Sequence, residues 1–303
     1  MTISSSVLSS EVRHPRNLSS GASGSIHDDA TATALGFRGG TVAGSIHMDQ
    51  FPPLLLRAFG DRWFERGSLS MYFRTALTDN EPVQAFVTVP GPGDDNLQTK
   101  VWAMTTGDVM VADGTAAIGD PAEPSALRSR DMRAVGPDGL RILARLKPGD
   151  SLADLELTPN AERQRRSISL GAMTEPLDWY SGPSPWGGPI ASPSAVVGML
   201  HAKVVASAKA TMGPHVGLFG AIELRFRSGP VFLDRAYHVT GEVVALSETP
   251  KTEVLWFDSR ASQPQADGNG ECVVAEMRMM LRILKQSSPL YAAADKSRER
   301  ASA

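Results

Sequence analysis

Cysteine is nearly absent from this chain of 303 residues, in which Cys272 is the only one. A single cysteine excludes an intramolecular disulfide and a metal cluster held by several thiolates. An excess of charge of one sign is also absent, because the formal net charge is -3 and the pI is about 6.1. Lysine and arginine are spread along the chain, so the sequence predicts no surface for nucleic acid or anionic lipid.

Long hydrophobic runs are missing as well. The most apolar stretch, residues 51–59, is interrupted by Pro52, Pro53 and Arg57, whereas a membrane-spanning helix needs about 20 apolar residues. Residues 1–20 contain no apolar segment of the roughly 7 to 15 residues that a secretory signal requires. We therefore expect no membrane association and a cytoplasmic location.

The short motifs of several large enzyme classes are also lacking. The chain has no Gly-x-Ser-x-Gly elbow, no Walker loop, no dinucleotide-binding glycine motif and no His-Glu-x-x-His helix. No cofactor is predicted. The adjacent side chains of His27, Asp28 and Asp29 rarely converge on one ion without distant ligands, so no metal site is predicted either.

The composition that remains is that of a turn-rich globular protein. Apolar residues make up 42% and charged residues 21% of the chain, and 28 glycines with 21 prolines imply many turns. The chain is about twice as long as a typical single domain of roughly 150 residues, so it holds two domains or one large one.

An internal repeat organises the chain. Residues 39–44 (GGTVAG) are echoed by residues 187–192 (GGPIAS), and Phe73-Arg74 is echoed by Phe226-Arg227. In both copies the Gly-Gly turn precedes an apolar helical segment, expected over 43–59 and 192–210, with a kink or restart at Pro52 and Pro53. Strands with alternating apolar residues follow, predicted over 68–76, 83–89, 97–105 and 109–117, and again over 221–227, 236–246, 253–259 and 272–284.

The alternation places apolar residues on one face of each strand, which is typical of antiparallel sheets covered on one side. Each repeat is then one helix with four or five strands, and pairing the two repeats edge to edge would remove an exposed sheet edge. We therefore predict an α+β protein. Its first unit covers 1–120, a connection covers 121–143, a second unit covers 144–289 and a frayed tail covers 290–303. A short helix is expected near 138–146, where the connection meets the second unit.

Residues 20–44 carry a resemblance to a known family. Ser20, Gly21, Ile26, His27, Asp29, Gly36, Phe37 and Gly44 match the motif of the MaoC-like enoyl-thioester hydratases and dehydratases, which have the hot-dog fold. Residues 146–152, 176–178 and 230–234 resemble parts of a second such domain. The resemblance implies a tandem, or double, hot-dog fold over nearly the whole chain, with two antiparallel sheets that each wrap a central helix.

The chain departs from the family motif at four positions. The catalytic Asp falls on Ala22, the Asn on Gly24, the Pro on Ser25, and the His before the central helix on Ala43. Because Asp and His act as a pair in the resembling hydratases, the alanine at position 22 argues for a changed reaction or a substitute acid.

His27 is the main catalytic candidate. A neutral imidazole near pH 7 can take a proton from water as the water attacks the β-carbon of the substrate. Asp28 and Asp29 could orient His27 or share the proton transfer, and Asp28 is the better candidate for a new catalytic role. Alternatively, the two carboxylates cap the helical turn over residues 30–35.

The resemblance also implies that a backbone amide at the start of the central helix stabilises enolate charge on the thioester oxygen. This assigns Gly44 and its neighbour Ala43 to substrate binding, although Gly44 could equally serve turn geometry. His47 is a candidate for an imidazole moved toward the space at Ala43, or else a packed structural residue.

In the second half no histidine occupies the corresponding region. Asp178, Tyr180 and Trp186 are expected there, as the wall of the substrate pocket or as braces of a loop. Asp178 is also a candidate acid or base.

The predicted function is that of a lyase of hydratase or dehydratase type, acting on an acyl thioester carried on coenzyme A or an acyl carrier protein. The alternatives are an acyl thioesterase and a non-catalytic protein that binds an acyl or polyketide-like ligand. A homodimer is compatible with the sequence.

Overall fold

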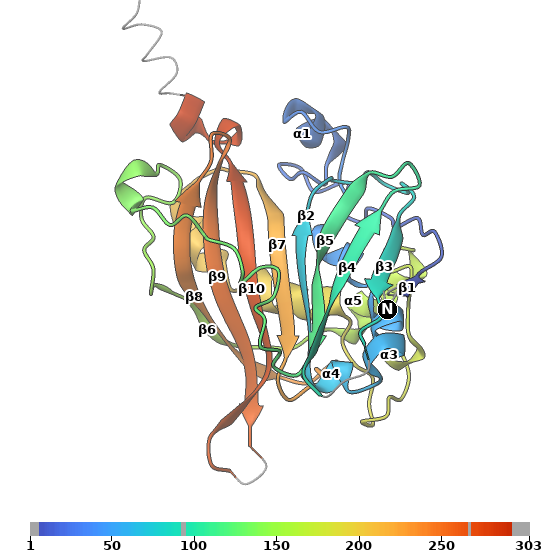
Figure 1. The fold of residues 1–303 in the computed structure, drawn as a ribbon. Coiled ribbons are helices and arrows are strands. Elements are labelled where there is room, and N and C mark those ends of the chain that lie inside the picture. The colour runs from blue at the N-terminus through green and yellow to red at the C-terminus, as the bar shows by residue number, and fades with distance from the viewer. Residues whose placement is uncertain (1–5, 92–94, 266–267, 293–303) are drawn as a thin grey trace, which may run out of the picture.

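Ten strands form one antiparallel sheet in the order β1-β3-β4-β5-β2-β7-β10-β9-β8-β6 (Figure 1). The structure is a computed structural model and describes residues 6–91, 95–265 and 268–292. Each half of the sheet contributes five consecutive strands to the order, and the two halves mirror each other about the β2–β7 pair. The predicted pairing of the two repeats edge to edge is confirmed.

The first half runs through β1 (Val7–Ser9), α1 (Asp29–Ala34), α2 (Gly44–Met48), α3 (Pro52–Phe59), α4 (Trp63–Arg66), β2 (Gly67–Phe73), β3 (Gln84–Thr88), β4 (Leu97–Met104) and β5 (Met110–Ile118). A 3-10 turn, η1 (Pro137–Gly139), lies in the connection. The second half runs through β6 (Ser151–Leu157), α5 (Ala161–Ser169), η2 (Asp178–Tyr180), α6 (Pro193–His201), α7 (Ala206–Met212), β7 (Gly217–Phe226), β8 (Tyr237–Glu248), β9 (Thr252–Pro264), β10 (Glu271–Leu284) and η3 (Lys285–Ser287).

The seam between the halves is the antiparallel pair β2–β7, in which Ser68 lies opposite Arg225 and Tyr72 lies opposite Ala221. Inward-facing residues of both strands, such as Leu69 and Leu224, join the main hydrophobic core, which spans both halves. The central helical segments of the two halves, blue and yellow in Figure 1, lie behind the sheet, whereas α1 lies above its upper edge. The central helices α2 and α6 contact each other across the seam.

Each predicted central helix is divided in two. In the first, α3 begins at Pro52, so the expected restart at the two prolines is confirmed. The second was expected to be continuous over 192–210, and this is wrong, because α6 ends at His201 and α7 begins at Ala206. Between them the side chain of Val204 packs against Gly241 of β8, where a Cβ atom would lie 2.4 Å from Val204 Cγ1.

The eight predicted strands are present with shifted ends, and β6 begins at Ser151, at the end of the segment 146–152 that resembles the strand entry of a second domain. In contrast, β1, α4 and α5 had not been predicted. The prediction of a short helix near 138–146 is wrong, since only η1 forms nearby. The helix does not form because the buried carboxylate of Glu253 accepts hydrogen bonds from the backbone amides of Arg141, Ile142 and Leu143 at 2.8 to 3.2 Å. Those amides are therefore not used in helical hydrogen bonds.

The connection between the halves crosses the face of the sheet opposite the helices, in front of β9 and β10 in Figure 1. Leu127 packs there with Tyr72, Trp256 and Met280, and its amide donates to Ser70 Oγ at 2.9 Å. Most of the predicted frayed tail, residues 293–303, lies outside the described residues. Among the helices of the described ranges, none is both long and apolar enough to cross a membrane.

Candidate active site

His27 lies in the loop before α1 and is held at both its backbone and its ring. The ring atom Nδ1 is 2.7 Å from the carbonyl oxygen of Thr41, and Asn17 Nδ2 donates to the His27 carbonyl at 2.8 Å. A carbonyl oxygen can only accept, so Nδ1 carries the hydrogen. In the neutral ring, Nε2 is then the nitrogen that can take a proton.

The two neighbouring carboxylates are engaged in hydrogen bonds within the same loop. Asp28 is the N-cap of α1, and its Oδ1 accepts from the hydroxyl and the amide of Thr31 at 2.7 and 2.9 Å. These bonds lower the pKa of Asp28. Asp29 Oδ1 accepts from the amide of Gly40 at 2.7 Å. This arrangement favours positioning roles for both residues.

The Gly-Gly turn fits closely around His27. A Cβ atom on Gly40 would lie 2.3 Å from the His27 carbonyl oxygen, whereas one on Gly39 would lie 3.3 Å from Asp29 Oδ1. Only glycine at position 40 lets the turn approach the histidine loop this closely. The turn therefore sets the distance between His27 and the start of α2.

Helix α2 begins at Gly44, after Ala43 as its N-cap, and no side chain caps its first amides. Both residues are half-buried. The ring of Phe73 covers one side of Gly44, since a Cβ there would lie 3.1 Å from Phe73 Cε2. Gly44 thus has a packing reason as well as an amide at the helix start.

His47 points into the protein. Its side chain is buried, Gln50 Nε2 lies 3.4 Å from its Nδ1, and burial lowers its pKa to about 4. The imidazole is therefore neutral at physiological pH and packed in the interior of the protein. This burial favours the alternative that His47 is a packed structural residue.

The second-half candidates lie at the opposite end of the central strands. Tyr180 is fully buried, Asp178 is exposed, and Trp186 Nε1 donates to Glu65 Oε1 of α4 at 2.8 Å. Trp186 is part of an edge-to-face cluster of aromatic rings that fills this end: Trp63, Phe64, Trp179, Trp186 and Phe226.

The loop that carries His27 packs at the other end of β2 and β7. Its neighbours Ile26, Leu35 and Phe37 contact Val216, Leu218 and Leu284. Because β2 spans seven residues, the two ends are separated by about 20 Å. The structure therefore does not bring Asp178, Tyr180 and Trp186 together with His27.

A pocket of about 250 Å³ lies beside the histidine loop. Thr41, whose carbonyl holds the His27 ring, lines it. The other lining residues belong to the Gly-Phe turn and to the chain after β2: Gly36, Phe37, Arg38, Gly39, Arg74, Thr75, Ala76 and Thr78.

Comparison with known structures identifies the architecture. A protein described as a MaoC domain dehydratase from Chloroflexus aurantiacus superposes with a TM-score of 0.60 at 12% identity, over 92% of this chain and 95% of that one. A Mycobacterium tuberculosis protein described as having a double hot-dog fold superposes with a TM-score of 0.58 at 11% identity, over 92% and 96%. The chain has the double hot-dog fold. No protein-family model and no curated protein sequence matches it.

The double hot-dog fold also encloses a polar group that the sequence analysis missed. Asp49, at the end of α2, is 1% exposed, and its Oδ1 accepts from the amide of Ser194 in the first turn of α6 at 2.8 Å. Burial raises the pKa of Asp49 to about 7, and hydrogen bonds from Ser194 and Ser192 oppose this rise. The carboxyl group is a tie between the two central helices.

Three buried polar atoms near this tie have no hydrogen-bond partner among the described residues: Asp49 Oδ2, Gln50 Oε1 and the hydroxyl of Tyr180. The negative charge of Asp49 contributes to raising the pKa of Tyr180, after burial. A sequence signal existed, because the repeat aligns Asp49 with Val197, which is buried and apolar. A carboxylate in an apolar helix stripe is a candidate for a special role.

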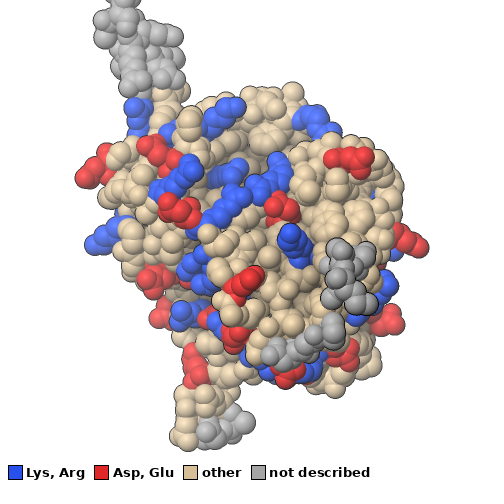
Figure 2. Space-filling model, viewed as in Figure 1, with Lys and Arg blue, Asp and Glu red and all other residues tan. Residues whose placement is uncertain are grey.

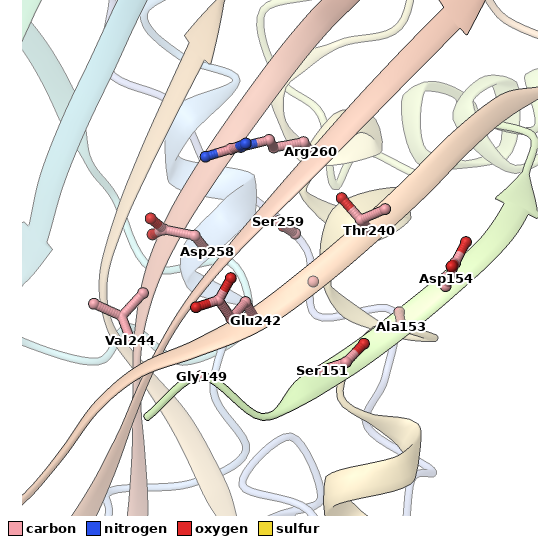
Figure 3. Close-up of a pocket in the computed structure, with 11 residues that line it drawn as sticks. Gly149, Ser151, Ala153, Asp154, Thr240, Glu242, Val244, Asp258, Ser259 and Arg260 are labelled. Carbon is pink, nitrogen blue, oxygen red and sulfur yellow. The ribbon is translucent and has the colours of Figure 1, made fainter. Parts of the chain in front are cut away.

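The larger pocket of about 350 Å³ lies elsewhere, on the outer face of β6, β8 and β9 (Figure 3). Its polar side chains include Asp154, Glu242, Asp258 and Arg260. Asp154 pairs with His238 at 2.6 Å, and Asp258 pairs with Arg278 at 2.7 Å. None of the predicted site residues lines this pocket.

Proposed function

We propose that this double hot-dog protein is a hydro-lyase, which adds water to an activated double bond of an acyl thioester or eliminates it. The observation that carries the proposal is the hydrogen bond from His27 Nδ1 to Thr41 O, 2.7 Å long. It fixes the ring and leaves Nε2 as the basic nitrogen, which is the arrangement a general base requires.

In the hydration direction, His27 Nε2 takes one proton from a water molecule. The water oxygen bonds to the β-carbon, and the electron pair of the double bond moves through the α-carbon to the thioester oxygen. The imidazolium then returns the proton to the α-carbon. One molecule of water has been added, and His27 is neutral again.

A single base suits the chemistry of this chain. Ala22, which replaces the family Asp, is exposed, and the carboxylates of Asp28 and Asp29 are used within the loop. The same group then serves as base and acid in turn, as microscopic reversibility permits. We assign Asp28 and Asp29 to holding the loop rather than to proton transfer.

Charge that develops on the thioester oxygen needs a donor. The proposed donors are the backbone amides at the start of α2, which begins at Gly44 directly after Ala43. No side chain caps these amides. The proposed substrate is a small molecule carried as a thioester on coenzyme A or an acyl carrier protein, and the pocket at the Gly-Phe turn supports its entry near His27.

A second candidate is a protein that binds an acyl ligand without chemistry. The observation that favours it is the same engagement of Asp28 and Asp29, which leaves His27 without a free carboxylate partner in its loop.

The test is to incubate the purified protein with a panel of enoyl, 3-hydroxyacyl and saturated acyl thioesters, following double-bond absorbance and free thiol together. We expect absorbance to change without release of thiol. Release of thiol would replace the proposal with a thioesterase, and binding without either signal would favour the second candidate.

A further inference from the structure

Three arginines converge on the outer face of the sheet around the ring of Tyr72. We call Arg74, Arg130 and Arg282 the arginine cluster. The guanidinium carbon of Arg130 lies 4.1 Å from the centre of the Tyr72 ring, and that of Arg74 lies 5.2 Å from it. Figure 2 shows lysine and arginine atoms gathered on this face, over the ends of β7 and β10.

The cluster is assembled from distant parts of the chain. Arg74 directly follows β2, Arg130 belongs to the connection between the halves, and Arg282 lies near the end of β10. Arg282 lies across Gly220 of β7, where a Cβ atom would be 2.9 Å from Arg282 Nε. The absence of a side chain at Gly220 therefore gives Arg282 its place beside the other two arginines.

The positive charge of the cluster is only partly balanced. Asp113 accepts two hydrogen bonds from Arg74, one of them 3.0 Å long from Nη2. Within the described ranges, no carboxylate forms an ion pair with Arg130 or Arg282. Burial, together with the like charges of Arg74 and Arg130, lowers the pKa of Arg282. The like charges of Arg130 and Arg282 repel each other, and no carboxylate pairs with either of them among the described residues.

Stacking on Tyr72 explains the positions of Arg74 and Arg130. It does not explain Arg282, which is half-buried beside two other cations. The hydroxyl of Tyr72 is also buried without a partner among the described residues. A bound anion would compensate the charge on Arg130 and Arg282.

We propose that the arginine cluster is a binding site for a phosphate group, as a monoester or within a diphosphate. The planar guanidinium donates two parallel hydrogen bonds to phosphate oxygens, and a doubly charged oxyanion matches the two unpaired arginines. Arg74 also lines the pocket beside the histidine loop. The phosphate site is therefore adjacent to that pocket, but it is built from residues other than His27 and does not depend on the proposed reaction.

The test is calorimetric titration of the full chain with inorganic pyrophosphate and, separately, with coenzyme A. We expect both to bind, and added salt to weaken both. The variants Arg282→Gln and Arg130→Gln should each lower the affinity by at least about tenfold, because each removes a charged hydrogen-bond donor. Tighter binding of coenzyme A than of pyrophosphate would identify a thioester carrier as the source of the phosphate, and equal binding would identify a free oxyanion.

The control is Arg145→Gln, which removes the same charge at an exposed position outside the cluster. It should leave the affinity unchanged, and melting temperatures should show that all three variants are folded. Arg282→Lys keeps the charge and should retain part of the affinity. Absence of binding by wild-type protein, or an equal effect of Arg145→Gln and Arg282→Gln, would overturn the proposal. His27→Ala should leave phosphate binding intact whether or not the protein is a hydro-lyase.

Discussion

Individual residues acquire their chemistry from one or two neighbours. His27 depends on the carbonyl of Thr41 for its tautomer, and Asp49 depends on enclosure between two helices for its raised pKa, about 7. Each effect is local, so a single substitution tests it.

His27→Ala should abolish turnover and leave the fold intact, because the side chain is half-buried in a loop. Loss of a general base lowers the rate by about 10²- to 10⁴-fold. Single-turnover rates and melting temperatures check this.

His14→Ala is a matched control for that variant. His14 is exposed, and its Nδ1 also lies next to a carbonyl, 3.0 Å from Asn80 O. It should have the wild-type rate. An unchanged rate in His27→Ala would move the chemistry elsewhere, and a collapsed melting temperature would assign His27 a structural role.

Asp49 should make the protein less stable as the pH rises. Its pKa is about 7 in the folded chain and about 3.9 in the unfolded chain, so between these values the folded state holds the extra proton. The stabilisation is complete below the unfolded pKa and is lost as the pH rises through about 7, at a cost on the order of a few kcal/mol.

Asp49→Asn should remove this contribution to the pH dependence and raise stability at pH values above the folded pKa, since the amide oxygen can still accept from Ser194. Urea unfolding midpoints on both sides of neutrality measure it. Parallel pH profiles for the variant and the wild type would contradict the assignment.

At the scale of elements, the Gly-Gly turn before α2 packs closely against the loop that carries His27. Gly39 and Gly40 are adjacent, yet only a Cβ at Gly40 would meet backbone, at 2.3 Å from the His27 carbonyl oxygen. The two glycines are therefore a matched pair for substitution.

Gly40→Ala should lower stability by about 1 to 3 kcal/mol, because the clash forces the backbone to move, and it should lower the rate by displacing His27. Gly39→Ala meets the Asp29 carboxylate at 3.3 Å, a contact that a small shift relieves. Thermal unfolding and kcat for both variants test this difference. Equal effects would show that the turn is not fitted to His27.

For the whole molecule, the two halves share one sheet and one core. The β2–β7 pair joins them, α2 contacts α6, and the main core contains buried residues from both. Neither half can bury its central face by itself, and each would expose the strand that forms the seam.

We therefore expect residues 1–130 and 131–303, expressed separately, to be insoluble or unfolded, and to form a folded complex when co-expressed. Circular dichroism and light scattering would show this. Two separately soluble halves with cooperative unfolding would contradict a shared core.

The sequence by itself predicted the repeat, the helix restart at Pro52, the alternating strands and the pairing of the two halves. These features are encoded locally, in glycine turns, proline positions and the two-residue period of apolar side chains. The motif around His27 likewise lies within one short segment.

Only the tertiary structure decided what depends on distant partners. Val204, in the break between α6 and α7, packs against Gly241 of a distant strand. The lost helix near 141–143 depends on the carboxylate of Glu253, and the buried tie at Asp49 depends on the start of α6. The separation of Asp178, Tyr180 and Trp186 from His27 follows from the antiparallel seam, which places the two similar loops at opposite ends of β2 and β7. Such contacts join residues far apart in the chain, so no local pattern carries them.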